Sequence, residues 1–211
     1  MIEEFVEIED TKHAGFAAAM EIYADAFPAN TRFEVDLLRE RIDKRLSCLY
    51  LGYLEDEVVF MALLWPLKNT EFILLDYIAT KKNYRRQGIG TAFMNQINQM
   101  LRERNKFMLI EVANPESGSN REQKHRRVAF YQQVGAKVMQ GVRYVVPPLD
   151  GSSMITEMLL MVFPEYRNDT IAAQMVKEAI VQIYRELYRR DRDDPVLNDF
   201  IHDIQDPIVL V

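Results

Sequence analysis

The sequence is short of the residues and runs that define several large classes of protein. Its 211 residues include a single cysteine, Cys48, which excludes an intrachain disulfide and makes the reducing cytoplasm the expected location. No apolar run approaches the roughly 20 residues that cross a bilayer. The acidic, mixed start at residues 1–13 does not resemble a signal peptide. We therefore expect a cytoplasmic protein that does not enter membranes.

The chain also has fewer basic than acidic residues, and few histidines. The 26 basic side chains are outnumbered by 32 acidic ones, and the formal net charge is −6. Nucleic-acid binding, which requires a basic surface, is therefore not expected, whereas a cationic small substrate fits this balance slightly better. The 3 histidines and the single cysteine form no cluster with metal-ligand spacing, so no metal is predicted.

The residues that are abundant are those of a globular chain. Hydrophobic residues make up 48% and charged residues 27%, a balance typical of one domain of ordinary size with a sizeable core. Alternation and helical periodicity predict an interleaved α/β structure. Expected strands lie at 5–10, 48–67 (two strands joined at an acidic turn), 71–80, 106–114, 136–146 and 154–163, and expected helices at 13–27, 32–46, 88–104 and 121–135.

The composition shifts after residue 163. Residues 168–191 have the apolar stripe of a long helix, for which Asn168 or Asp169 would serve as the N-cap. The tail that follows is apolar for a surface segment. We predict a domain over 1–163 and a C-terminal helix and tail over 164–211, packed on the domain or on a partner chain; a homodimer stays open.

The stretch Asn-Tyr-Arg-Arg-Gln-Gly-Ile-Gly-Thr-Ala-Phe, residues 83–93, follows an expected strand and enters an expected helix. The first N–H groups of a helix have no partner within it and carry partial positive charge. Gly88 and Gly90 would let an anion approach this backbone, and Arg85 and Arg86 add charge suited to phosphate oxygens. Neither a P-loop nor a dinucleotide fingerprint is present. The simpler interpretation is a tight turn with solvated arginines.

Two stretches decide between these interpretations. The spacing Arg85-x-x-Gly88-x-Gly90, directly after Leu-Asp-Tyr-Ile-Ala-Thr, resembles the acyl-coenzyme A (acyl-CoA) signature of the GNAT superfamily of N-acyltransferases. Residues 126–136, Arg-Arg-Val-Ala-Phe-Tyr-Gln-Gln-Val-Gly-Ala, look like a later helix of that family. The resemblance covers residues 5 to 163 in element order. It implies an α/β (α+β) fold with a mixed, twisted, mostly antiparallel sheet and helices on both faces, to which this chain adds a C-terminal helical extension.

The resemblance also implies a cofactor site for acetyl-CoA. In the family, the pantetheine arm pairs with the backbone of the fourth strand and the diphosphate lies against the turn that follows. The backbone N–H of Ile78 would polarise the thioester carbonyl. Many members have a pantetheine-contacting asparagine where this chain has Gln123-Lys124-His125, and Asn114 would substitute for it. The predicted cofactor-binding residues are Ile78, Ala79, Thr80, Arg85, Arg86, Gln87, Gly88, Ile89, Gly90, Thr91 and Asn114.

The predicted catalytic residues are Tyr131 and Asp76. By resemblance, Tyr131 is the acid that protonates the departing thiolate, and a free phenol keeps its proton at neutral pH because its pKa is about 10. The alternative is a core aromatic. Asp76, on the strand face of Ile78, would take the amine's proton; the alternative is a structural hydrogen bond. Glu111 is the second choice of base. His125 is expected on the surface, and Cys48 is expected to be a small buried hydrophobe.

The predicted activity is transfer of an acetyl group from acetyl-CoA to a primary amine of a small molecule or peptide, by direct attack in a ternary complex. The segments 28–34, 114–121 and 147–153 would select the acceptor. Glu34, Asp36 and Glu116 could attract a cation, but each is more simply a solvated charge. The alternative is a non-catalytic acyl-CoA sensor or assembly subunit with the same fold. A third alternative is transfer of a longer acyl group. Val-Gly-Ala at 134–136 lacks the aromatic residue common in the family, which would leave a wider cleft.

Overall fold

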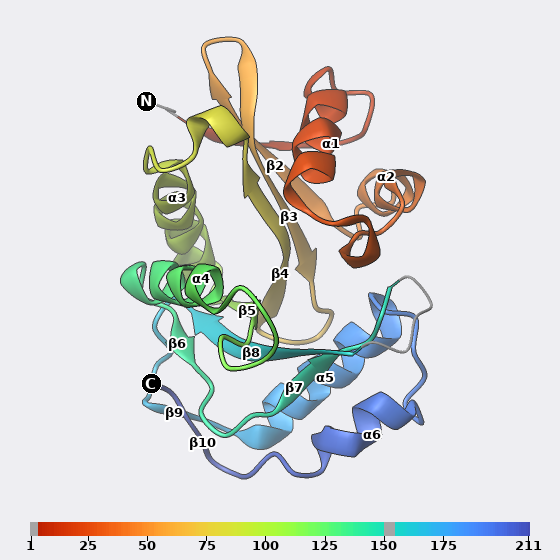
Figure 1. Cartoon of the computed structure of the whole chain (residues 1–211), viewed down its shortest axis with the longest axis vertical. Coiled ribbons are helices and arrows are strands. Elements are labelled where there is room, and N and C mark those ends of the chain that lie inside the picture. The colour runs from red at the N-terminus through yellow and green to blue at the C-terminus, as the bar shows by residue number, and fades with distance from the viewer. Residues whose placement is uncertain (1–3, 150–154) are drawn as a thin grey trace. The chain divides into compact units, whose positions relative to one another are not determined.

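The computed structural model describes residues 4–149 and 155–211, which form two compact units (Figure 1). The first unit comprises Met1–Pro66 and Ile73–Glu103, and the second comprises Leu67–Phe72 and Arg104–Val211. The fold is the mixed α/β type that the sequence predicts, with a mostly antiparallel sheet flanked by helices. The division into domains at residue 163 stays a prediction. Among the described residues, no helix is both long and apolar enough to span a membrane.

The first unit is built on four strands that pair antiparallel in the order β1-β2-β3-β4. Their alternating side chains supply two apolar faces, and helices cover each of them. The strands are β1 (Phe5–Ile8), β2 (Cys48–Leu54), β3 (Glu57–Pro66) and β4 (Phe72–Thr80), and the helices are α1 (Gly15–Ala26), α2 (Val35–Asp43) and α3 (Ile89–Glu103), with short 3-10 turns η1 (Ala29–Thr31) and η2 (Lys82–Tyr84).

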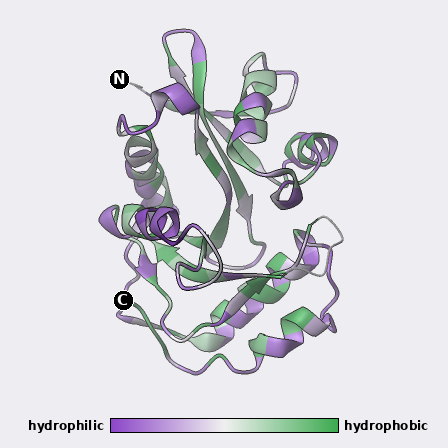
Figure 2. Cartoon of the chain, in the orientation of Figure 1, coloured by the Kyte–Doolittle hydropathy of each residue, from purple (hydrophilic) through white to green (hydrophobic). Residues whose placement is uncertain are grey.

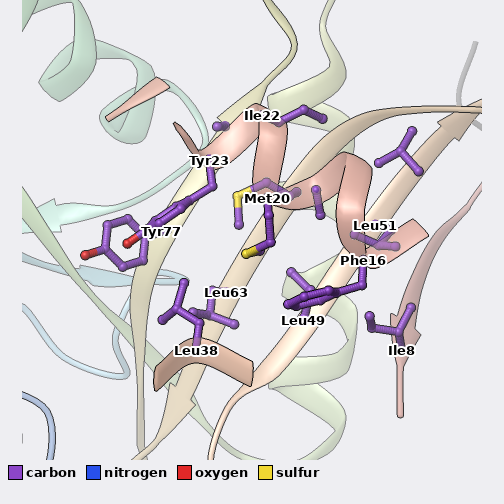
Figure 3. Packing of buried hydrophobic residues seen from close by; sticks show 14 of the residues in the cluster. Ile8, Phe16, Met20, Ile22, Tyr23, Leu38, Leu49, Leu51, Leu63 and Tyr77 are labelled. Atoms are coloured by element: carbon purple, nitrogen blue, oxygen red, sulfur yellow. The ribbon is translucent and has the colours of Figure 1, made fainter. Parts of the chain in front are cut away.

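Helices α1 and α2 lie on one face of this sheet and α3 lies on the other. Figure 3 shows Phe16 and Met20 of α1 and Leu38 of α2 packed over β2, β3 and Tyr77 of β4. On the opposite face, the ring of Phe93 in α3 packs on Phe60, with centroids 4.9 Å apart. Because both faces are covered, β3 has buried residues throughout its interior rather than an alternating pattern.

The second unit is organised around β8, which pairs antiparallel with β5 on one edge and with β6 and then β7 on the other. Helix α4 precedes β6, and in Figure 2 it is mostly purple, as expected from its many charged residues. The elements are β5 (Phe107–Ala113), α4 (Arg121–Gln133), β6 (Lys137–Val138), β7 (Tyr144–Val146), β8 (Thr156–Phe163), β9 (Thr170–Ile171), α5 (Ala173–Glu186), α6 (Pro195–Ile201) and β10 (Ile208–Val209).

The C-terminal segment is part of the second unit. The Tyr184 hydroxyl of α5 donates to the carbonyl oxygen of Val145, and Phe200 of α6 packs edge-on against Tyr144, with ring centroids 5.9 Å apart. At the end of the chain, Val211 exchanges two backbone hydrogen bonds with Val138, of 2.7 and 3.0 Å. Both helices and the end of the chain thus contact strands β6 and β7 of the sheet.

Two predicted elements differ from the structure. The expected strand 136–146 is interrupted by a turn in which Gly141 has φ +74, so it forms the two short strands β6 and β7. The expected helix 168–191 is shorter, because β9 precedes it and Asp169 accepts a backbone hydrogen bond from Leu210. Neither Asn168 nor Asp169 caps it: the N–H of Ala173 donates to Asp206 Oδ1 at 2.7 Å.

Candidate functional site

The turn between β4 and α3 is held by several side-chain hydrogen bonds. Glu57 at the start of β3 receives hydrogen bonds from Lys81 and from the Tyr84 hydroxyl, each 2.5 Å long. The hydrogen bond from Lys81 and, as a smaller effect, the one from Tyr84 hold the pKa of the Glu57 carboxyl below its usual value. The backbone of Lys81 also donates to Val59 at 2.8 Å. The loop is therefore fixed to β3 before the helix begins.

Gly88 stands at the mouth of α3 in a conformation that favours glycine. Its φ is +78, and a Cβ built on it would meet nothing within 4 Å. The helix makes its first bond from Ala92 N–H to the Gly88 carbonyl, at 2.9 Å. The N–H groups of Ile89, Gly90 and Thr91 come before this bond, so they lack acceptors within the helix. Open space thus surrounds the Cβ position of Gly88, the residue directly before the helix.

The two arginines before this helix differ in how they are held. The Nε–H of Arg85 donates to the Thr80 carbonyl at 3.0 Å, and its Nη2 lies 3.6 Å from Asp25 Oδ2. Arg86 is exposed, has φ +64, and forms no ion pair within residues 4–149 and 155–211. Gln87 donates to the Asn83 carbonyl at 3.3 Å. One guanidinium is thus tied to the end of β4, and the other projects into solvent.

Strand β4 changes its register at Asp76. Tyr77 pairs with Leu63 and Leu75 pairs with Leu64, so Asp76 is the extra residue of a bulge. After the bulge, partly exposed Asp76, Ile78 and Thr80 alternate with buried Tyr77 and Ala79. Asp76 and Ile78 thus share a face of the strand. Bulges of this kind re-aim side chains and are frequent beside active sites.

The buried face of β4 holds the connection between α1 and α2. The Tyr77 hydroxyl donates to the Thr31 carbonyl at 3.0 Å, and Tyr23 exchanges hydrogen bonds with the backbone of Phe33. The two tyrosine rings, which Figure 3 shows side by side, have centroids 4.7 Å apart. Burial raises the pKa of Tyr23 to about 12, and burial followed by the Asp76 charge raises the pKa of Tyr77. The predicted acceptor segment 28–34 is therefore anchored by two neutral phenols.

Tyr131 lies on α4, in the second unit. It is 4% exposed, whereas its neighbour Phe130 is only partly buried, as expected for adjacent helical residues that point about 100° apart. Burial raises the pKa of Tyr131 to about 12, against a smaller opposing effect of the Arg127 charge. The phenol therefore keeps its proton across the physiological range.

Asn114 and Glu116, two other candidates in the second unit, are both held by interactions with neighbouring residues. The amide of Asn114 donates to Glu157 Oε1 at 2.7 Å, and its Oδ1 accepts from the N–H of Glu116 at 3.0 Å. Glu116 pairs with Arg121 and with His125, whose Nε2 lies 3.4 Å from Glu116 Oε1. Both interactions order the segment 114–121. Residues 150–153 of the predicted segment 147–153 lie outside the described residues.

The predicted residues fall in both units. The turn residues, Ile78–Thr80 and Asp76 belong to the first, and Tyr131 and Asn114 to the second. Sequence reasoning missed Glu57 and Tyr84, which hold the turn, because a contact between residues 27 apart in the chain leaves no periodic pattern. In the described part of the chain, no three His, Cys, Asp or Glu residues are grouped to bind a metal ion.

One protein-family model matches the chain. The family model described as the acetyltransferase (GNAT) family matches residues 16–136, more than half of the chain. This range contains the turn, the bulged strand and Tyr131. No curated protein sequence is significantly similar to the chain.

Solved structures resemble the chain over most of its length. A Bacteroides thetaiotaomicron protein named as a GNAT-family acetyltransferase has a TM-score of 0.73 at 20% identity, over 88% of this chain and 98% of that one. The ribosomal-protein-S18-alanine N-acetyltransferase from Escherichia coli gives 0.56 at 18%, over 80% and 97%. An aminoglycoside 6′-N-acetyltransferase complexed with coenzyme A gives 0.58 at 13%, over 75% and 95%. At these identities the likeness shows the fold.

Proposed function

The chain belongs to the acetyltransferase (GNAT) family, and from this premise we propose that it transfers an acetyl group from acetyl-CoA to a primary amine. Family membership supports acyl transfer from an acyl-CoA donor in general. The finer proposal is direct attack of the amine on the thioester in a ternary complex, with no covalent enzyme intermediate. It is supported by the residues described above and by the chemistry that the reaction requires.

The observation that carries the proposal is the open helix N-terminus behind Gly88. A diphosphate needs several donors on one side and no side chain in the way, and the N–H groups of Ile89, Gly90 and Thr91 meet that need. Arg85 and Arg86 supply charge next to them, and Gln87 a further amide. The pantetheine arm is assigned to the backbone of Ile78, Ala79 and Thr80, of which Ile78 and Thr80 are partly exposed, and Asn114 is proposed as a further contact for it. We assign the acyl-CoA donor to these residues.

Tyr131 is proposed as the acid of the reaction. When the amine nitrogen bonds to the acetyl carbon, the carbon–sulfur bond breaks and leaves a thiolate that must gain a proton. A buried phenol whose pKa lies at about 12 is fully protonated at neutral pH and can supply that proton. The resulting phenolate regains a proton from water after the products leave.

Asp76 is proposed as the group that receives the proton lost by the amine. An amine attacks only in its neutral form, so an ammonium substrate must first be deprotonated. The bulge makes Asp76 the residue that interrupts the pairing of β4, and it shares a face with Ile78, whose N–H would polarise the thioester carbonyl. Proton transfer through a water molecule fits this arrangement.

The acceptor is proposed to be a primary amine of a small molecule or peptide. The net charge of −6 favours a cation over an anion. Two proteins of the same fold are named for amine acceptors of different kinds, an aminoglycoside and the alanine of a ribosomal protein. Fold alone does not choose between such classes.

A panel assay tests the proposal. Acetyl-CoA would be incubated with the chain and a polyamine, an amino acid, an aminoglycoside or a peptide with a free N-terminus, and released thiol would be measured. We expect release with one class of amine. Acetyl-CoA binding without release from any of them would contradict the proposed activity and favour a sensor or assembly subunit.

A further inference from the structure

Glu111 of β5 is the carboxylate of the second unit that is most enclosed by tyrosines. The Tyr144 hydroxyl of β7 donates to its Oε1, and the Tyr188 hydroxyl, two residues beyond α5, donates to its Oε2 at 2.7 Å. Tyr188 itself packs edge-on against Tyr184, with ring centroids 5.7 Å apart. Strand β7 and the residues that follow α5 in the C-terminal segment therefore converge on the carboxyl group of a β5 residue.

This carboxyl has an unusual charge environment. Burial raises the pKa of Glu111, and the hydrogen bonds from Tyr144 and Tyr188 oppose that rise because they favour the charged form. Among the described residues, Tyr184 is a further titratable group that interacts with the Glu111 charge, and on the neighbouring strand β8 Glu111 is paired with apolar Leu160. No lysine, arginine or histidine within the described residues forms an ion pair with Glu111. Enclosed carboxylates normally have a cationic partner.

Glu111 also retains the capacity for another hydrogen bond. A carboxylate offers about four lone-pair sites, and the two tyrosines occupy two of them. The residue keeps part of its surface accessible, although protein surrounds most of it. A primary ammonium group would supply both the missing positive charge and the additional donors.

We propose that Glu111 is the residue that binds the ammonium group of the acceptor, with Tyr144 and Tyr188 as positioning residues. This role rests on the proposed acetyl transfer and extends it by making the C-terminal segment part of the acceptor site. Glu111 acts in binding the amine, so its replacement affects the KM of the amine rather than kcat.

Three variants of the full chain test this role. Glu111→Gln removes the charge, and Tyr188→Phe removes one hydrogen bond while keeping the ring. Tyr166→Phe is the matched control, because the Tyr166 hydroxyl donates to Glu71 at 2.6 Å in the same unit, away from Glu111. For each variant, kcat and the KM of the best amine in the panel would be measured from pH 5 to pH 9 at saturating acetyl-CoA.

We expect Glu111→Gln to raise the amine KM at least about tenfold, since a hydrogen bond to a charged group contributes about that much or more to affinity, and to leave kcat within about threefold. In the unmodified chain, the amine KM should rise as falling pH protonates Glu111. Tyr188→Phe removes a bond that favours the charged carboxylate, so the same rise should begin at higher pH. Tyr166→Phe should change neither quantity.

Two results would overturn the inference, and they are distinguishable. If the unmodified chain transfers acetyl groups but Glu111→Gln and Tyr188→Phe match Tyr166→Phe in amine KM and in its pH dependence, the cluster is only a structural tie. If the unmodified chain transfers to no amine, the proposed function fails and this role fails with it. Should Glu111→Gln not fold, Tyr188→Phe alone decides, because the pH at which KM rises does not depend on stability.

Discussion

At the scale of single residues, helical geometry predicted that Tyr131 and its neighbour Phe130 would differ in burial. Adjacent helical residues point about 100° apart, so only one of Phe130 and Tyr131 could be fully buried, and it is Tyr131. Strand alternation likewise placed Asp76 and Ile78 on one face. The bulge at Asp76 could not be predicted, because it depends on the pairing partner Leu63–Leu64 and leaves no mark in the sequence of β4.

The role proposed for Tyr131 predicts a specific kinetic defect. Tyr131→Phe removes the proton donor but keeps the ring, so kcat should fall about a hundredfold, within the range of general acid catalysis, while acetyl-CoA affinity stays nearly unchanged. Steady-state kinetics and calorimetry would measure the two quantities. An unchanged kcat would remove Tyr131 from the reaction.

The same residue predicts a pH dependence. A free phenol loses its proton near pH 10, but burial raises the pKa of Tyr131 to about 12. Since a raised pKa keeps the acid protonated to higher pH, kcat at saturating amine should not decline between pH 8 and pH 10. A decline centred near pH 10 would indicate an ordinary, exposed phenol and contradict the burial of Tyr131.

At the scale of elements, local patterns predicted most of the helices and strands and failed where distant segments intervene. The turn at 55–56, the helix after Gly88 and the end of α4 shortly before Gly135 follow from residues close in sequence. Helix α5 starts later than predicted because residues 169–171 pair with the tail, including β10. The first N–H group of α5, that of Ala173, donates to Asp206, which lies 33 residues away in the sequence. Capping patterns consider only residues next to the helix, so they could not predict this bond.

Helix α6 has a local cap whose removal should be measurable. Asp194 accepts hydrogen bonds from the N–H groups of Val196 and Leu197, at 2.9 and 3.2 Å. Asp194→Ala should lower the free energy of unfolding by about 1 kcal/mol. The control is Asp193→Ala, an exposed neighbour of equal charge. Equal midpoints of urea unfolding for the two variants would contradict the cap.

The contact of Glu57 with the turn predicts an effect on cofactor binding. Glu57→Gln weakens the bonds from Lys81 and Tyr84, so acetyl-CoA affinity should fall about threefold, in keeping with an exposed ion pair. The control is Glu55→Gln, which removes the same negative charge from the same hairpin. It measures how far the loss of that charge alone changes the affinity for anionic acetyl-CoA. Because the pKa of Glu57 is lowered, the effect should persist through neutral pH and disappear only as acid protonates the carboxyl. Equal affinities of the two variants would contradict it.

At the scale of the whole molecule, the fold followed from the order of elements and two short motifs, and family membership agrees with it. The packing of residues 164–211 did not follow. Their helix is amphipathic, but an apolar stripe does not say which surface it covers. Here α5 packs beside β7, and the tail joins β6, so Tyr188 of this segment contacts Glu111. The residues proposed to bind the acceptor are therefore harder to predict than those proposed to bind the donor.

The central claim is that the turn at 85–91 binds acetyl-CoA, and one calorimetric comparison tests it most directly. Gly88→Glu places a carboxylate in the open space before α3, and Gly88→Ala is its control, because alanine has the same backbone strain at φ +78 without the charge or bulk. The unmodified chain should bind acetyl-CoA with micromolar affinity and more tightly than ATP. Gly88→Glu should lose at least about tenfold more affinity than Gly88→Ala. Equal affinities of the two variants for acetyl-CoA would show that the turn does not hold the cofactor.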